Sequence, residues 1–130
     1  MFKISEASAI ALHSIIYINN KDETSSLKEI AGEFNISANH LSKVLQRFVK
    51  EGVLISVKGP SGGFKINQKY KDMTFMEVYE IFEGKYRSHN CLFNNGHGNC
   101  TKCIMSDLIS GIEKEFTDYM TNTKISDFKS

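Results

Sequence analysis

The chain has 130 residues, of which 41% are hydrophobic and 24% are charged. This is about the length of one globular domain with enough apolar residues for a core, which excludes general disorder. No apolar run reaches the roughly 18 to 20 residues that cross a bilayer, so we expect no membrane span, no signal peptide and a cytoplasmic protein. All three cysteines lie between Cys91 and Cys103, and their odd number excludes a complete set of intramolecular disulfides.

The net charge of +1 conceals an uneven distribution. Residues 1–70 carry nine Lys/Arg against six Asp/Glu, a balance of +3, whereas residues 71–130 carry seven against nine, a balance of −2. Between Lys43 and Lys69 there are six basic residues and one acidic residue, Glu51, which gives a local net charge of +5. We therefore expect a polyanion to contact this region and not the whole surface.

Three helices are predicted in the first fifty residues. The first covers about residues 5–19, where apolar and small residues recur along one face. The second begins after Ser26, with Glu29 in the reciprocal capping position. The third runs from the N-cap Ser37 to Gly52, and its apolar residues recur at helical spacing. The second and third helices, joined by a short turn, form a helix-turn-helix pattern.

A β-hairpin is predicted directly after the third helix. Residues 53–57 are apolar and β-branched, residues 58–63 (KGPSGG) interrupt them, and residues 64–66 resume an alternating pattern. A helix-turn-helix that runs into such a hairpin is a winged-helix arrangement. The expected fold is therefore mainly α with a small β-hairpin wing, and residues 1–70 are expected to form the winged helix-turn-helix domain.

The second half, residues 71–130, is expected to hold a sensing loop and a dimerisation helix. A capped helix begins at Thr74, with Glu77 in the reciprocal position. A polar loop follows over residues 88–103. Beyond it, residues 104–120 repeat apolar side chains at helical spacing, at Ile104, Leu108, Ile112, Phe116 and Tyr119 or Met120. This stripe is apolar enough to pack against a second copy, although packing within its own domain is the alternative.

The outward side of the third helix is expected to read DNA bases in the major groove. Asn39 suits a bidentate contact with adenine, Lys43 suits guanine or a phosphate, and Arg47 suits a phosphate. A glycine turn at the hairpin tip permits close approach to a phosphate or the minor groove. The predicted DNA-binding residues are Ser37, Asn39, His40, Lys43, Arg47, Lys58, Ser61, Gly62 and Lys65. The alternative is an ordinary solvated helix face, with His40 structurally incidental.

Residues 36–64, ISANHLSKVLQRFVKEGVLISVKGPSGGF, resemble the recognition helix and wing of the bacterial winged-helix regulators that include IscR, NsrR and CymR. KGPSGGF is similar to that family's basic-Gly-x-x-Gly-Gly-aromatic signature, and SANHLSKVL resembles the NsrR recognition helix. MFKISEASAIAL, MTFMEVYEIFEG and KISDF also fit the family's patterns. The resemblance implies a transcription regulator that binds a pseudo-palindromic DNA operator as a homodimer through its long helix.

The loop over residues 88–103 gathers five potential ligands among Gly and Asn residues, namely His89, Cys91, His97, Cys100 and Cys103. Thiolates suit iron-sulfur clusters and zinc. Composition alone also allows a tetrahedral zinc site of Cys91, His97, Cys100 and Cys103, or ordinary thiols.

The family resemblance implies that Cys91, Cys100 and Cys103 hold an iron-sulfur cluster, with a fourth ligand from elsewhere. Because the C-x8-C-x2-C spacing departs from the usual family pattern, a [2Fe-2S] and a [4Fe-4S] cluster both stay open. Ser106 occupies the position of the IscR-like histidine ligand. The NsrR-like arrangement implies an acidic ligand on the partner's first helix, and Glu6 is the matching residue. His97 and His89 are its local rivals, and the alternative role for Glu6 is to stabilise the helix N-terminus.

The expected function is a DNA-binding regulator whose operator binding responds to redox state, nitric oxide or iron supply through the cluster. Oxidation, nitrosylation or loss of the cluster is expected to release a tie to the partner's first helix and change the spacing of the recognition helices. The alternative is a metal-independent or zinc-binding repressor that works with a protein partner. No Walker or H-E-x-x-H motif is present, so an enzyme is not expected.

Overall fold

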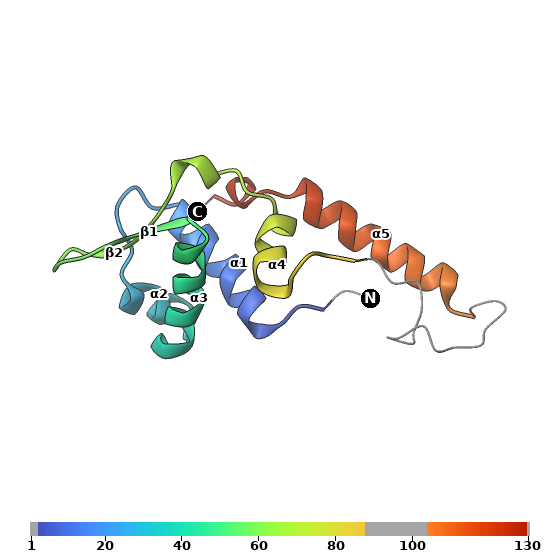
Figure 1. Ribbon diagram of the computed structural model, residues 1–130, viewed down its shortest axis with the longest axis horizontal. Coiled ribbons are helices and arrows are strands. Elements are labelled where there is room, and N and C mark those ends of the chain that lie inside the picture. Colours follow the sequence, from blue (N-terminus) through green and yellow to red (C-terminus); the bar gives the residue numbers. More distant parts are fainter. Residues whose placement is uncertain (1–2, 88–103, 130) are drawn as a thin grey trace.

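The computed structural model of the chain describes residues 3–87 and 104–129 (Figure 1). It is mainly helical, with one antiparallel two-stranded sheet in the described part. In chain order the elements are α1 (Glu6–Asn19), α2 (Leu27–Phe34), α3 (Ala38–Lys50), β1 (Leu54–Val57), β2 (Gly63–Ile66), the 3-10 helix η1 (Gln68–Tyr70), α4 (Phe75–Glu83), α5 (Ser106–Asn122) and the 3-10 helix η2 (Ile125–Asp127). The predicted helices and hairpin are confirmed, whereas the two 3-10 helices were not predicted.

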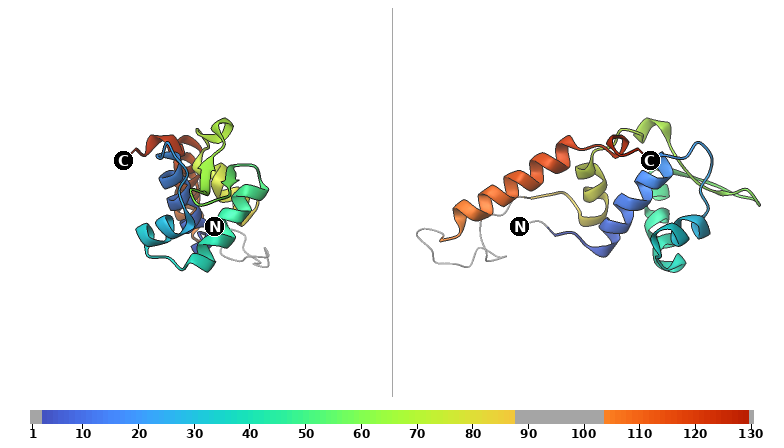
Figure 2. Two further views of the ribbon diagram at one scale, coloured as in Figure 1. Left: turned by 90° about the vertical axis from the view of Figure 1, so that its left-hand side faces the viewer. Right: turned by 180° about the vertical axis from the view of Figure 1, so that it is seen from behind.

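Helix α1 lies at the centre of the molecule and contacts α3, α4, β2 and η2. The β1–β2 hairpin projects from one end of the body and α5 extends toward the other, as Figures 1 and 2 show. None of the helices within residues 3–87 and 104–129 is long and apolar enough to cross a membrane.

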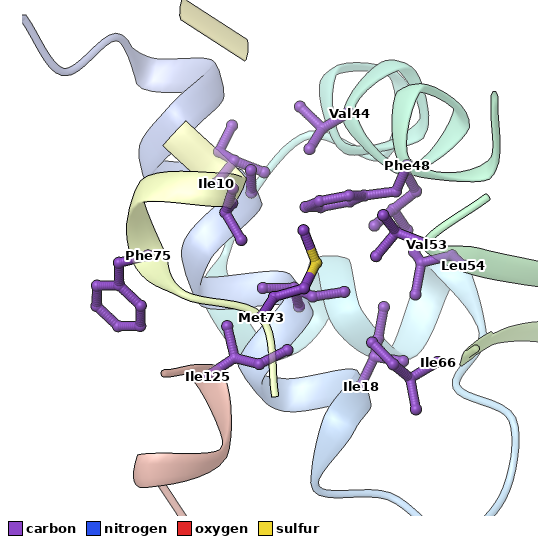
Figure 3. Packing of buried hydrophobic residues seen from close by; sticks show 14 of the residues in the cluster. Ile10, Ile18, Val44, Phe48, Val53, Leu54, Ile66, Met73, Phe75 and Ile125 are labelled. Atoms are coloured by element: carbon purple, nitrogen blue, oxygen red, sulfur yellow. The ribbon is translucent and has the colours of Figure 1, made fainter. Parts of the chain in front are cut away.

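One hydrophobic core joins both halves of the sequence. Phe48 of α3 is fully buried near Val53 and Met73 (Figure 3). The same cluster includes Ile125 of η2 and Met120 of α5. Helices α2 and α3 therefore share one core with elements from the second half of the chain.

Polar N-caps define the helix starts, as the sequence predicts. The Ser37 hydroxyl accepts a hydrogen bond from the His40 amide at 3.0 Å, and Thr74 and Glu77 form a reciprocal capping box. At α2 the Ser26 hydroxyl accepts from the Glu29 amide. The Glu29 carboxylate, however, accepts from the Tyr17 hydroxyl at 2.6 Å instead of from the cap amide, because α1 places Tyr17 within reach. This hydrogen bond is the largest cause that raises the pKa of Tyr17 to about 12.

The wing is anchored to the segment between α1 and α2. Ser25 and Phe64 exchange two backbone hydrogen bonds, of 2.9 and 2.8 Å, and so add a bridge beside β2. Gly63 lies so close to this segment that a Cβ atom there would be 2.3 Å from the Ser25 carbonyl oxygen. Near the tip, the Thr24 hydroxyl donates to the Ser61 carbonyl at 2.8 Å. The glycine therefore permits a close approach of two backbones.

The stripe predicted on the long helix divides into two parts. Met120 is buried, and the half-buried Phe116 packs against Tyr79 of α4, with ring centroids 5.5 Å apart. Toward the N-terminal end of α5, Leu108 is 56% exposed, and Ile104 just before the helix is 95% exposed. Among the residues that the structure describes, the stripe thus packs within its own chain at Phe116 and Met120, whereas Tyr119 beside them is 54% exposed.

Candidate nucleic-acid interface and sensor residues

Helix α3 separates an apolar side from a polar side. Leu41, Val44, Leu45 and Phe48 are buried. The opposite side exposes Asn39, Lys43, Gln46 and Lys50. Because the buried residues fix the rotation of the helix, this polar side points away from the protein body and is available to a ligand.

Gln46 is a candidate DNA-reading residue that sequence reasoning missed. It lies two turns beyond Asn39 on the same side of α3 and is exposed. Its amide can pair with adenine in the same bidentate way as that of asparagine. The helical repeat of 3.6 residues placed it on the outward face, and this signal was available from the sequence.

His40, Lys43 and Arg47 border a groove between α1, α3 and α4. The Arg47 Nε lies 3.3 Å from the Glu51 carboxylate on the same helix. The groove has a volume of about 290 Å³, and its lining also includes Ala7, Val44 and Phe82. The arrangement places the cationic side chains of Lys43 and Arg47 beside this groove, where they suit phosphate contacts.

The hairpin supplies a second basic surface. Lys58, Ser61 and Lys65 are exposed, and Gly62 is half-buried. A Cβ atom on Gly62 would lie 2.3 Å from the Val57 carbonyl oxygen, so the tight turn requires glycine. The predicted wing residues therefore lie together on a projecting hairpin, while Ser37 acts in the structure as the α3 cap.

Glu6 lies in the first turn of α1 and is the described member of the predicted metal-ligand set. Its side chain is 78% exposed, and one carboxylate oxygen lies 3.8 Å from Nδ1 of His40 on α3. The exposed carboxylate is therefore accessible to a ligand while it also borders α3.

The remaining predicted ligands, Cys91, Cys100, Cys103, His89 and His97, lie outside the described residues. Over the described part of the chain, no group of three or more His, Cys, Asp or Glu side chains is arranged to hold a metal ion. The donor set of three thiols and one accessible carboxylate fits an iron-sulfur cluster chemically.

The start of α1 is fastened to the end of α4 by Glu83. One oxygen of its carboxylate accepts from the Ser5 amide at 2.8 Å and from the Ser8 hydroxyl at 3.0 Å. Partial burial raises the pKa of this carboxyl, but the hydrogen bonds from Ser5 and Ser8 and the charge of Lys3 outweigh it and leave the pKa below its usual value. Glu83 is thus held as a carboxylate.

An apolar groove of about 490 Å³ lies on another side of α1. Its walls come from α1, α2, α4, the C-terminal end of α5 and the segment after η2. The lining residues are Leu12, His13, Ile16, Tyr17, Asn20, Phe34, Phe75, Tyr119 and Phe128.

Comparison with known proteins assigns the chain to a family. The Rrf2 family, described as iron-dependent transcriptional regulators, matches residues 4–130. The transcriptional regulator NsrR of Halalkalibacterium halodurans is 28% identical over 112 residues, which cover 85% of this chain and 76% of that protein. The regulator IscR of Vibrio cholerae is 24% identical over 121 residues, covering 91% of this chain and 65% of that protein.

The fold is similar to that of CymR, the global cysteine regulator of Bacillus subtilis. The two structures align with a TM-score of 0.77 at 22% identity, covering 98% of this chain and 95% of that one. The match to the family extends over both the helix-turn-helix with its wing and the second half of the chain. The chain belongs to the Rrf2 family of transcriptional regulators.

Proposed function

We propose that this regulator binds operator DNA through α3 and the wing, and that an iron-sulfur cluster controls this binding. The observation that carries the DNA-binding part is the polar face of α3, which exposes Asn39 and Lys43 opposite a fully apolar side. A projecting hairpin with Lys58 and Lys65 adds the contact expected with the backbone or the minor groove. In this proposal residues 1–70 bind DNA, whereas the loop 88–103 and the helix over 104–120 serve sensing and dimerisation in a cytoplasmic protein.

The proposed cluster ligands are Cys91, Cys100 and Cys103 of one subunit and Glu6 of the partner subunit. Such a cluster supplies redox chemistry and reactivity toward nitric oxide. Support comes from the donor chemistry, from the accessible Glu6 carboxylate 3.8 Å from His40, and from relatives named NsrR and IscR. Because Glu6 borders the recognition helix, a change in what the carboxylate binds can alter how His40 is held.

A metal-independent or zinc-binding regulator is the second candidate. It is favoured by the zinc-compatible donor set of Cys91, His97, Cys100 and Cys103. Quantitation of iron, sulfide and zinc in the protein purified without oxygen separates the two candidates. Iron and sulfide would support the cluster, and stoichiometric zinc would support the second candidate.

A homodimer through α5 is the proposed assembly. Leu108 and Ile104 are exposed beside the N-terminal end of α5, whereas an apolar groove that includes Tyr119 lies at its C-terminal end. In a dimer with two-fold symmetry, the exposed end of α5 in each copy can pack into the apolar groove of the other copy, so the same contact forms twice. The dimer would present two recognition helices to a pseudo-palindromic operator.

Substitutions on α3 separate base recognition from phosphate binding. Asn39→Ala is expected to weaken binding to the preferred duplex by about 1 to 3 kcal/mol and to relax the preference at one base pair. Arg47→Ala is expected to weaken binding to preferred and random duplexes alike. It should also lower by about 1 the slope of the logarithm of the binding constant against the logarithm of the salt concentration. Titrations with a duplex selected from a random-sequence pool by the wild-type protein, at several salt concentrations, measure both effects.

The two variants act as mutual controls, because both residues are exposed and neither belongs to the core. If Asn39→Ala weakened random and selected duplexes equally, Asn39 would not read a base. If the wild-type protein selected no sequence, the proposal of operator binding would be wrong.

Leu108→Glu is expected to convert the dimer to a monomer. The substitution places a charge on the exposed end of α5, where burial against a second copy would require its desolvation. Because Leu108 is 56% exposed in one chain, the free energy of unfolding of the monomer should change little. Analytical ultracentrifugation measures the mass, and Glu115→Gln, an exposed substitution on the same helix, is the control. A dimer of unchanged affinity would exclude Leu108 from the interface.

A further inference from the structure

The first turn of α1 lies between the end of α4 and the recognition helix. On the α4 side, Glu83 accepts hydrogen bonds from the Ser5 amide and the Ser8 hydroxyl. On the α3 side, Glu6 lies 3.8 Å from His40. One turn of helix thus connects His40 on α3 with Glu83 on α4, which are 43 positions apart in the sequence.

Glu83 makes the connection to α4 strong and directional. Hydrogen bonds that a carboxylate accepts are stronger than those between neutral groups. The Ser5 amide lies at the start of α1, where helical amides have no partner within the helix. A negative charge at this end also interacts favourably with the helix dipole. Ser8, which donates the second bond, is fully buried, so the contact has little freedom to shift.

The same turn also packs against α3. Ala7 lines the groove between α1, α3 and α4 together with Val44 and Phe82. Because Ala7 follows Glu6 directly, the hydrogen bonds of Glu83 fix both the packing of this turn and the position of the Glu6 carboxylate. A movement of the turn away from α4 would change the contact with His40.

We propose that Glu83 is a positioning residue for operator recognition: it holds the first turn of α1 on α4 and thereby keeps Glu6 beside His40 on the recognition helix. This inference rests on the proposed DNA-binding function of α3, but it does not require a cluster. It assigns to α4 a role in DNA recognition although α4 carries no predicted DNA contact.

The test compares Glu83→Ala with Glu80→Ala in the 130-residue chain. Glu80 is a control on the same helix, because its carboxylate accepts from the Tyr86 amide at 2.7 Å instead of from α1. Glu83→Ala is expected to weaken binding to the duplex selected by the wild-type protein by about three- to tenfold. Affinity for a random duplex should be retained, and Glu83→Gln, which keeps an acceptor, should restore part of the loss.

A second readout does not depend on DNA. In nuclear magnetic resonance spectra of the metal-free protein, Glu83→Ala is expected to shift the side-chain resonances of His40 and to leave those of His13 in place. His13 is a suitable internal reference because its ring contacts Phe34 and the Ala9 carbonyl. Ser8→Ala, which removes only one of the two donors to Glu83, should give a smaller shift in the same direction.

Double substitution shows whether Glu83 acts through Glu6. In a Glu6→Ala background, Glu83→Ala is expected to cost less selected-duplex affinity than in the wild-type background. The proposal is overturned if Glu83→Ala and Glu80→Ala have the same effects, or if the His40 resonances do not move. Failure of the wild-type protein to select any duplex would instead reject the DNA-binding function, since the His40 measurement stands without it.

Discussion

Phe48→Ala is expected to lower the free energy of unfolding by about 3 to 5 kcal/mol. Phe48 is 0% exposed and packs edge to face on Phe82, with ring centroids 5.1 Å apart. It connects α3 to the core beside Val53 and Met73 (Figure 3). Alanine at this position would leave a cavity in addition to the lost burial of the ring. Urea denaturation followed by circular dichroism measures the change.

Phe128→Ala provides a matched control for the deletion of a phenyl ring. Phe128 is 42% exposed and stacks on Phe75, with ring centroids 5.4 Å apart. Its replacement is expected to cost about 1 kcal/mol, because much of the ring is already in water. Equal losses for the two variants would contradict the assignment of Phe48 to the centre of the core.

Simultaneous replacement of Cys91, Cys100 and Cys103 by serine is expected to abolish the binding of iron and sulfide. Serine is a poor ligand for a soft iron-sulfur site, so the visible absorption of the anaerobically purified protein should disappear. The difference in operator affinity between the wild-type protein as purified and after removal of the metal should disappear as well. Iron and sulfide quantitation, visible spectroscopy and DNA titration measure the three changes.

Single substitutions test the fourth ligand. Glu6→Ala is expected to retain some iron but to lose it faster during exposure to a chelator, whereas His97→Ala and His89→Ala should behave like the wild-type protein. The reverse order would assign the fourth position to a histidine of the loop. A colourless wild-type protein with stoichiometric zinc would reject the cluster and favour the zinc-binding alternative.

The sequence predicted the local elements of the fold because their signals are local. The cap Ser37, the apolar repeat of α3 and the capping box at Thr74 each depend on residues within a few positions of one another. The outward face of α3 follows from the same repeat, which is why Asn39 and Lys43 were predicted as exposed and why Gln46 was within reach of prediction.

The remaining features depend on contacts between distant segments. The Glu29 carboxylate binds Tyr17 of α1, although the spacing after Ser26 predicted that it would return to its own cap. Glu83 contacts Ser5 and Ser8, which lie more than seventy residues earlier, and no spacing pattern in the sequence indicates this. Such side chains have several local partners available, and only the packing of the helices decides among them.

The attachment of the wing has a consequence for how DNA preference can change over evolution. Because Thr24 donates to the Ser61 carbonyl near the tip and Ser25 is paired with Phe64 in β2, the hairpin is held to the segment before α2 at two points. Its reach and angle are therefore properties of the segment before α2 as well as of the hairpin. Substitutions or insertions in that segment can change the position of the wing while the predicted DNA-binding residues stay the same.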